Sequence, residues 1–377
     1  MPNAKDHAVA VGMQTLQLRP FDEIDSLILT QIVYMPLEGL LGKGERATLA
    51  QAGEFLRGEY PDGFSDPFQQ KRFELTLVCA ENPRYQAWEL HDYYNKIDPE
   101  REMQFCVCSF DLPLGQTYVA FRGTDWSLTG WKEDLNMSFM TVPSQQEAVE
   151  YMERIATGSG NAFMLGGHSK GGNLAVFAGA RVSGSVQERI RRVYCFDGPG
   201  VDEETLNSLE YELISERIAS YLPQSSIVGM LLHYHPVYTV VRSKSYGILQ
   251  HDAMKWQIRE GEFVTVDGVD FSGRMTDETL HGWLKTIDMD TRRLLVDTVY
   301  KVLEASQEET LDGMIKDWHE SALRMLEALR ELDPEVRKHV ERILKGLFGA
   351  GAAGAVRSLL PHVLRKNADE DEEQDEI

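Results

Sequence analysis

The chain has 377 residues, of which 42% are hydrophobic and 26% are charged, values that are ordinary for a globular protein with a sizeable core. Its formal net charge of -22 argues against nucleic acid as a partner, because binding a polyanion requires clustered Lys and Arg. The same surplus of carboxylates offers no electrostatic attraction to an anionic membrane surface.

Leader, membrane and metal signals are weak throughout the sequence. The first residues lack the basic patch and apolar run of a signal peptide, and no run of about 18 or more apolar residues occurs. None of the four cysteines belongs to a CxxC pair or a Cys/His cluster, so we expect buried free thiols in a reducing compartment. These features predict a soluble, cytoplasmic protein. The cysteines are Cys79, Cys106, Cys108 and Cys195.

The first half of the chain predicts helices mixed with short strands. Apolar positions at helical spacing predict a helix from Phe21 to about Leu56. Ser144, with Glu147 three residues later, is a capping-box pattern that predicts a helix to Ala156. Short apolar runs predict strands at Phe73 to Ala80, Gln104 to Phe110 and Thr117 to Phe121.

Strands and helices then alternate, which implies a mostly parallel sheet with helices on both faces. A helix is predicted through about Arg181. The predicted strands in this part are Ala162 to Leu165, Arg192 to Phe196, Ile218 to Leu222 and Tyr238 to Val241.

From about Asp288 onward the pattern is helical only. We therefore expect a first domain over residues 1–290, a helical extension over 291–366 and a disordered acidic tail over 367–377. The Gly- and Ala-rich stretch 346–364 fits either a weak membrane-surface contact or a packing helix of small residues, and we favour the packing helix.

The sharpest motif is Gly167-His168-Ser169-Lys170-Gly171, a G-x-S-x-G sequence between an apolar strand and a predicted helix. A serine in a sharp strand-to-helix turn has strained backbone angles, so its neighbours two positions away must be small. The turn raises the hydroxyl above the sheet edge, next to a helix N-terminus that favours developing negative charge. Ser169 is therefore the predicted nucleophile. His168 and Lys170 occupy variable positions, and we interpret Lys170 as a helix-surface residue.

A second motif, Phe121-Arg122-Gly123-Thr124, closes an upstream strand. Acyl transfer through a tetrahedral intermediate is helped most by two donors aimed at the oxyanion. We predict an oxyanion hole formed by the backbone N–H groups of Thr124 and Lys170, with the Thr124 hydroxyl as a third donor. In the alternative, Arg122 and Asp125 only stabilise a turn.

The segments YVAFRGT, WKEDL and GGHSKGGNLA resemble the class 3 lipase family. More closely, FRGT, GHSKGGNLA, FDGPG and QHDAMKW resemble a bacterial family of lipase-like proteins known as a domain of unknown function. The likeness runs from about Phe21 to Tyr300. It implies an α/β-hydrolase fold, a Ser-His-acid triad and a lipid or ester substrate, so residues 1–290 become the expected α/β-hydrolase domain.

A serine nucleophile needs a histidine base, which in this fold follows the serine in the chain. His251 follows the apolar run Tyr238 to Val241 and a Ser/Lys/Gly loop, where a base on the last sheet loop is expected. His281 is the competing candidate, because class 3 lipases carry their base far downstream, near an aromatic residue. His233 and His235 come too early for the last strand.

The acid is the point at which the sequence departs from the class 3 pattern. Ser226 occupies the position where those lipases carry Asp, just before an apolar Ile-Val pair. Asp197 is a reasonable substitute, because the rigid turn Asp-Gly-Pro-Gly that it opens would hold a carboxylate still. Alternatively Asp197 only caps that turn, and Asp202 and Asp252 are weaker candidates for the acid.

These residues together predict a serine esterase or lipase-like hydrolase with a catalytic triad of Ser169, His251 and Asp197. It would cleave a small-molecule carboxylic ester or acyl lipid through an acyl-enzyme intermediate, and it requires neither a metal nor an organic cofactor. Two alternatives remain open: a non-catalytic binding or scaffolding protein on a hydrolase fold, favoured by Ser226, and an acyltransferase with the same triad.

Overall fold

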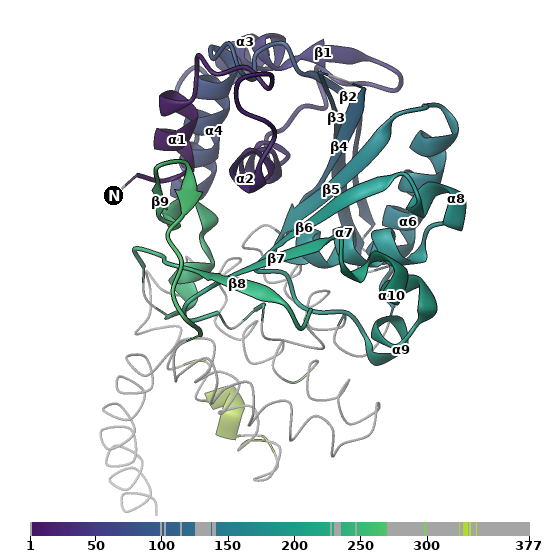
Figure 1. The fold of residues 1–377 in the computed structure, drawn as a ribbon. Coiled ribbons are helices and arrows are strands. Elements are labelled where there is room, and N and C mark those ends of the chain that lie inside the picture. The colour runs from purple at the N-terminus through teal and green to yellow at the C-terminus, as the bar shows by residue number, and fades with distance from the viewer. Residues whose placement is uncertain are drawn as a thin grey trace, which may run out of the picture. The chain divides into compact units, whose positions relative to one another are not determined.

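The computed structural model of the protein divides into two compact units. The first contains Met1–Asp125 and Thr129–His281, and the second contains Trp126–Leu128 and Gly282–Ile377. All helices and strands named below belong to the first unit (Figure 1). The structure describes residues 2–98, 100–101, 103–113, 115–124, 137, 141–226, 228–229, 235–245, 247–269, 298, 324, 327–330, 332 and 337.

Most of the predicted helical extension, residues 291–366, and all of the predicted acidic tail, residues 367–377, lie outside the described residues. Within the extension, residues 327–330 are helical.

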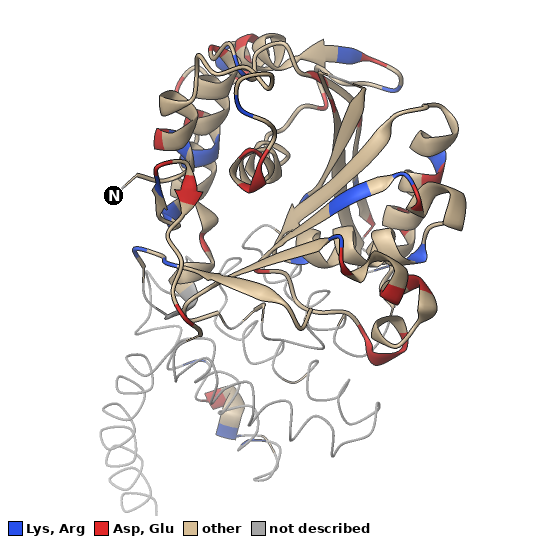
Figure 2. Ribbon diagram, viewed as in Figure 1, with Lys and Arg blue, Asp and Glu red and all other residues tan. Residues whose placement is uncertain are grey.

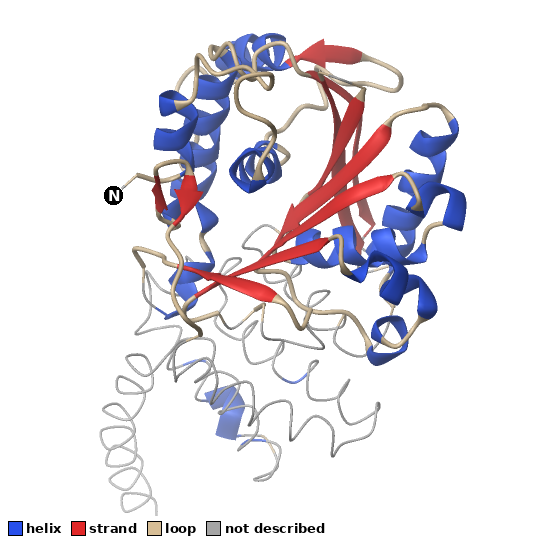
Figure 3. Ribbon diagram, viewed as in Figure 1, coloured by secondary structure: helices blue, strands red, loops and turns tan. Residues whose placement is uncertain are grey.

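One sheet of eight strands runs through the first unit, and its strands lie side by side in chain order (Figure 3). The pairs from β1 to β4 are antiparallel, and those from β4 to β8 are parallel. The strands are β1 (Arg46–Thr48), β2 (Glu89–Asp98), β3 (Met103–Leu112), β4 (Gln116–Phe121), β5 (Ala162–His168), β6 (Ile190–Phe196), β7 (Ile218–Pro223) and β8 (Tyr238–Val241). A separate hairpin consists of β9 (Ile258–Arg259) and β10 (Glu262–Phe263).

Helices cover both faces of the sheet. On one face α2 packs against β4, β5 and β6 and against α1 and α4; on the other, α7 packs against β5, β6, α6 and α10. A separate cluster of buried apolar side chains fills each side. The helices are α1 (Ala4–Ala10), α2 (Glu23–Ile32), α3 (Leu49–Glu59), α4 (Pro67–Ala80), α6 (Pro143–Thr157), α7 (Lys170–Arg181), α8 (Gly184–Gln187), α9 (Glu203–Leu206) and α10 (Leu209–Ser215), with 3-10 turns η1 (Gly247–His251) and η2 (Ala253–Lys255).

The predicted fold class is confirmed: a mostly parallel sheet with helices on both faces, in which one central strand turns sharply into a helix, is an α/β-hydrolase fold. The predicted strands that became β3 to β8 are all present, and the helix after the G-x-S-x-G motif ends at Arg181 as expected. The polar strand β2 was not predicted, because its sequence lacks a clear apolar alternation.

The prediction of a strand over Phe73 to Ala80 is wrong, because this segment is the second half of helix α4. Asp66 caps the helix, because its side chain accepts hydrogen bonds from two backbone N–H groups of the first turn, and Pro67 is the first helical residue. A short apolar run alone does not separate a buried helix from a strand. The deciding signal lay upstream of the run.

Two other predicted helices are correct only in part. The expected helix from Phe21 to Leu56 is two helices, α2 and α3, with strand β1 between them. Helix α6 exists, but its capping residue is Val142 rather than Ser144, and the side chain of Gln145 accepts the hydrogen bond of the Val142 N–H at 3.0 Å.

Candidate active site

The predicted site residues lie at one edge of the sheet, in loops that follow its parallel strands. Thr124 follows β4, Ser169 follows β5, Asp197 follows β6, Ser226 follows β7, and His251 ends the 3-10 turn η1 that follows β8. Because the carboxyl ends of parallel strands lie at the same edge, these loops are neighbours although the chain separates them widely.

Ser169 stands at a strained strand-to-helix turn. Its backbone angles are φ 60° and ψ -134°, a region that residues with a Cβ rarely adopt. The turn is fixed on both sides, since the Ser169 N–H donates to the carbonyl of Phe196 at 2.9 Å and the Ser169 carbonyl accepts from the Gly172 N–H at 2.8 Å. The surrounding backbone therefore maintains a conformation that would be unfavourable in isolation.

The two glycines of the motif are required by close backbone packing. A Cβ at Gly167 would lie 2.0 Å from the carbonyl carbon of Gly171. A Cβ at Gly171 would lie 2.1 Å from the carbonyl oxygen of Phe121, the last residue of β4. Neither contact can be relieved by rotating a side chain, so larger residues are excluded at both positions.

His251 and Asp197 are joined by a hydrogen bond. The imidazole Nδ1 lies 2.7 Å from the carboxylate Oδ2, and both side chains are buried. Since a carboxylate only accepts, Nδ1 carries the proton, and Nε2 is the nitrogen that can act as a base in the neutral ring. Asp197 itself has φ 48°, a left-handed conformation that Asp tolerates better than most residues.

Ser226 hydrogen-bonds to the same carboxylate. Its hydroxyl donates to Oδ1 of Asp197, and the backbone N–H of Gly229 donates to that oxygen at 3.1 Å. Three donors from two other loops therefore converge on Asp197: the imidazole, a hydroxyl and a backbone N–H. The residue whose identity departed from the lipase pattern thus supports the carboxylate on the neighbouring strand.

The weaker acid candidates have other partners. Asp202 caps helix α9, where its carboxylate accepts from the backbone N–H of Thr205 at 2.8 Å. Asp252 caps the short turn η2 and forms an ion pair with Lys71 at 3.0 Å. Neither carboxylate bonds to His251 in the described part of the chain.

His168, which the sequence treats as a variable position, is a second buried imidazole beside the first. Its Nε2–H donates to the backbone carbonyl of His251 at 2.7 Å, and the two ring centroids lie 4.6 Å apart. Burial, with smaller contributions from the charges of His251 and Arg72, lowers the pKa of His168 well below its ordinary value. The ring is therefore neutral near pH 7, with its proton on Nε2. The position of His168 directly before Ser169 was the one sequence signal for its contact with the site. Its partner, the carbonyl of His251, could not be predicted from the sequence.

The interpretation of Lys170 as a helix-surface residue is wrong. Its side chain is buried, and its Nζ donates to the backbone carbonyl of Gln104 in β3 at 2.6 Å. The first turn of α7 packs against the end of β4, which covers this side of the helix. The lysine thereby ties the turn that carries Ser169 to the antiparallel half of the sheet.

Of the two predicted oxyanion donors, Lys170 directly follows Ser169 in the chain, and Thr124 lies on a loop that approaches the serine. Lys170 is the first residue of α7, and the N–H groups of a first helical turn are not used within the helix. A Cβ at Gly123 would lie 3.1 Å from the Cβ of Ser169, so the loop that continues to Thr124 touches the serine. Thr124 is half-buried.

The remaining candidates lie elsewhere or outside the described residues. His235 pairs its Nδ1 with the hydroxyl of Tyr211 on α10 at 3.0 Å, and burial lowers its pKa. His233 and His281 fall outside the described residues. All four cysteines are buried and free, as predicted. The described residues contain no cluster of His, Cys, Asp and Glu suited to a metal ion.

Comparisons with known proteins give one family and several lipases. A family model described as Mbeg1-like matches residues 79–301, more than half of the chain. No curated protein matches the sequence. None of the described helices is both long enough and apolar enough to cross a membrane.

Solved structures of fungal lipases are similar to this chain at low identity. A mutant form of MDLA from Penicillium cyclopium is 11% identical, with 58% of this chain and 83% of that chain covered and a TM-score of 0.33. The native propeptide complex of Rhizomucor miehei lipase is 12% identical, with 66% and 76% covered and a TM-score of 0.35. Lipase II from Rhizopus niveus is 17% identical, with 59% and 89% covered and a TM-score of 0.31.

Proposed function

This chain belongs to the Mbeg1-like family, and from that premise and its side-chain geometry we propose that it is a serine hydrolase that cleaves a carboxylic ester or acyl lipid. The observation that carries the proposal is the hydrogen bond of 2.7 Å between His251 and Asp197. These two residues lie on loops at the same edge of the sheet as the strained turn at Ser169. A structural histidine does not need a buried carboxylate fixed by two further donors. A general base does, because the carboxylate selects the ring tautomer and stabilises the imidazolium that forms.

In the proposed mechanism the Ser169 Oγ attacks the ester carbonyl while Nε2 of His251 accepts the hydroxyl proton. Asp197 keeps the Nδ1 proton of His251 in place and stabilises the positive ring. The backbone N–H groups of Thr124 and Lys170 donate to the oxyanion. His251 then returns its proton to the departing alcohol oxygen. An incoming water, deprotonated by His251, hydrolyses the acyl-enzyme.

His168 and Asp197 together hold the base, His251, in position. His168 is neutral and buried, and its hydrogen bond to the carbonyl of His251 restrains the backbone that carries the imidazole. Asp197 restrains the ring from the other side. A base that is restrained at both backbone and ring loses little entropy in reaching the reactive geometry.

A fluorophosphonate probe tests the proposal, because it forms a covalent bond only with an activated serine. We expect the wild-type protein to be labelled and Ser169→Ala to be unlabelled, with both proteins folded by circular dichroism. Ser185→Ala, which removes an exposed hydroxyl from α8, is the matched control and should label like wild type. A wild-type protein that stays unlabelled would indicate a non-catalytic binding protein on a hydrolase fold.

Hydrolysis of p-nitrophenyl esters of increasing acyl length then measures turnover and the preferred chain. The same assay with and without an added alcohol separates water from another acyl acceptor. Release of free acid as the main product at ordinary alcohol concentrations supports the hydrolase, and predominant ester exchange would assign an acyltransferase instead.

A further inference from the structure

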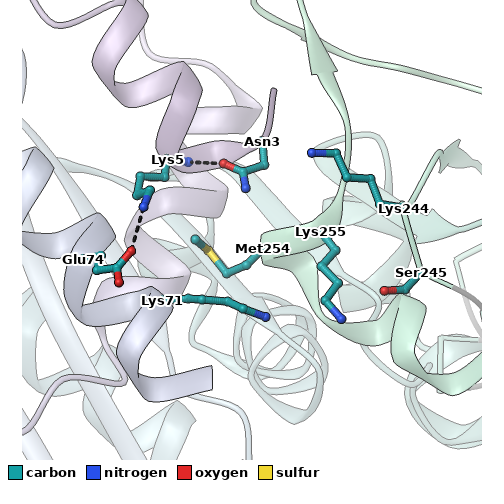
Figure 4. Close-up of a pocket in the computed structure, with 8 residues that line it drawn as sticks. All are labelled: Asn3, Lys5, Lys71, Glu74, Lys244, Ser245, Met254 and Lys255. Atoms are coloured by element: carbon teal, nitrogen blue, oxygen red, sulfur yellow. Dashed lines mark hydrogen bonds and ion pairs between the residues drawn. The ribbon is translucent and has the colours of Figure 1, made fainter. Parts of the chain in front are cut away.

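A pocket lined by lysines lies beside the loop that carries His251. Its volume is about 410 Å³, within the range of small-molecule sites. Helix α4 forms one wall, and Lys244, Ser245, Met254 and Lys255 line the opposite wall (Figure 4). The lining residues are Asn3, Lys5, Lys71, Glu74, Lys244, Ser245, Met254 and Lys255.

The charge of this pocket is opposite to that of the whole chain. Four lysines contribute four positive charges, and among the described residues the carboxylates that form ion pairs with them are Glu74, with Lys5, and Asp252, with Lys71. Four positive and two negative charges leave a surplus of two positive charges. The complete chain carries a net charge of -22, and acidic residues gather on helices α9 and α10 (Figure 2). The pocket therefore concentrates positive charge in a chain whose overall charge is strongly negative.

Two of the lysines have no ion-pair partner among the described residues, although their backbones are fixed. The Lys244 N–H donates to the carbonyl of Lys255 at 3.0 Å, and the neighbouring residues Ser243 and Trp256 form an isolated β-bridge. Both residues line the same wall of the pocket. Two positive charges on one wall without a counter-charge repel each other, so an anion in the pocket would stabilise the arrangement.

Neutral donors complete the lining. The side-chain oxygen of Asn3 caps α1, accepting from the N–H groups of Lys5 and Asp6, which leaves its amide N–H₂ as a donor. Ser245 is nearly buried and contributes a hydroxyl. In Figure 4 the ammonium groups of Lys71 and Lys244 point into the space from opposite walls.

We propose that this pocket binds the phosphomonoester group of a small phosphorylated molecule. A phosphomonoester carries close to two negative charges at neutral pH and three acceptor oxygens. That charge matches the surplus of two, and the oxygens match the ammonium, amide and hydroxyl donors. The group would lie next to Lys71, whose other partner, Asp252, directly follows His251 in the chain.

Isothermal calorimetry on the Ser169→Ala protein tests the site independently of hydrolysis, so that its failure does not bear on the proposed function. The probe is glycerol 3-phosphate, with succinate as a dianion that lacks phosphate geometry. We expect saturable binding of glycerol 3-phosphate that weakens several-fold when NaCl is raised from about 50 to about 300 mM, because salt screens exposed charges. Succinate should bind at least about tenfold more weakly, since two carboxylates at its ends do not match one tetrahedral group.

The double substitution Lys244→Gln/Lys255→Gln should weaken this binding by about tenfold or more while leaving the melting temperature unchanged, because it removes the two uncommitted cations. The matched control is Lys43→Gln/Arg191→Gln, which removes the same charge from exposed positions outside the pocket and should bind like the parent.

Equal binding by the two double variants would overturn the assignment, as would equal binding of succinate, or an absence of binding both to glycerol 3-phosphate and to vesicles containing phosphatidic acid. Flotation with vesicles containing phosphatidic acid distinguishes the source of the group. Vesicle binding that depends on Lys244 and Lys255, without binding of glycerol 3-phosphate, would retain the phosphomonoester site and assign it to a lipid head group.

Discussion

Replacing Asp197 with Asn should reduce the reactivity of Ser169 far more than it reduces stability. The carboxylate of Asp197 accepts from three donors: Nδ1 of His251, the hydroxyl of Ser226 and the N–H of Gly229. An amide offers one accepting oxygen and one donating N–H₂ group. The N–H₂ group of the new side chain must therefore lie opposite one of these donors, with which it cannot form a hydrogen bond.

The contacts of Asp197 indicate how the amide would be oriented. If the amide oxygen keeps the Ser226 and Gly229 bonds, its N–H₂ faces His251, whose Nδ1 must lose its proton to accept. The ring proton then sits on Nε2, where it prevents proton transfer from Ser169. The opposite orientation points the N–H₂ at the Gly229 N–H and takes away the acceptor of the Ser226 hydroxyl, so it loses two buried hydrogen bonds and is disfavoured. We therefore expect a loss of about 10³- to 10⁴-fold, which corresponds to about 4–5.5 kcal/mol in the activation free energy.

The assay is the second-order rate of fluorophosphonate labelling, with p-nitrophenyl ester turnover as a second readout. Asp202→Asn is the matched control, because Asp202 caps α9 and Asn is an equally good capping residue. Ser226→Ala should give an intermediate loss of about tenfold, because the carboxylate keeps its charge and the Gly229 bond. An Asp197→Asn protein that retains more than about a tenth of the wild-type rate would refute this account of the base.

Three further predictions concern other residues. His168→Ala should lower the labelling rate about tenfold, because the carbonyl of His251 loses its donor. His168→Gln can place an N–H₂ near the same point and should recover most of the rate. Equal rates for the Ala and Gln variants would contradict this positioning role. Gly171→Ala should destabilise the protein by about 3 kcal/mol in urea unfolding, because a Cβ there meets backbone, whereas Gly160→Ala, in open space, should change little. Burial lowers the pKa of His7 from its ordinary 6.5 to about 4, so between these values the unfolded chain binds a proton that the folded chain does not, and stability falls as pH falls. His7→Gln should remove about 1.4 kcal/mol of that dependence per pH unit, measured against wild type, and parallel pH curves for the two proteins would count against it.

The lipase-like turn could be predicted from the sequence because all of its determinants are consecutive. A buried strand, two glycines around Ser169 and a following helix specify the sharp turn within about a dozen residues. The parallel strands were also predictable, since each is a short apolar run bounded by turn residues. The half of α4 from Phe73 to Ala80 was not, because its apolar run fits either helix or strand and its capping signal lies upstream.

The sequence by itself therefore determined the fold class, the candidate serine and a short choice of histidines and carboxylates. Only the tertiary structure decided which of them meet. Asp197 and His251 are 54 residues apart, and Lys71 and Asp252 are 181 apart, so their pairings depend on how strands and loops assemble rather than on local propensity. The burial of Lys170 and the support that Ser226 gives to Asp197 have the same origin. Contacts between distant segments are products of packing, and residue spacing along the chain does not encode them in a readable form.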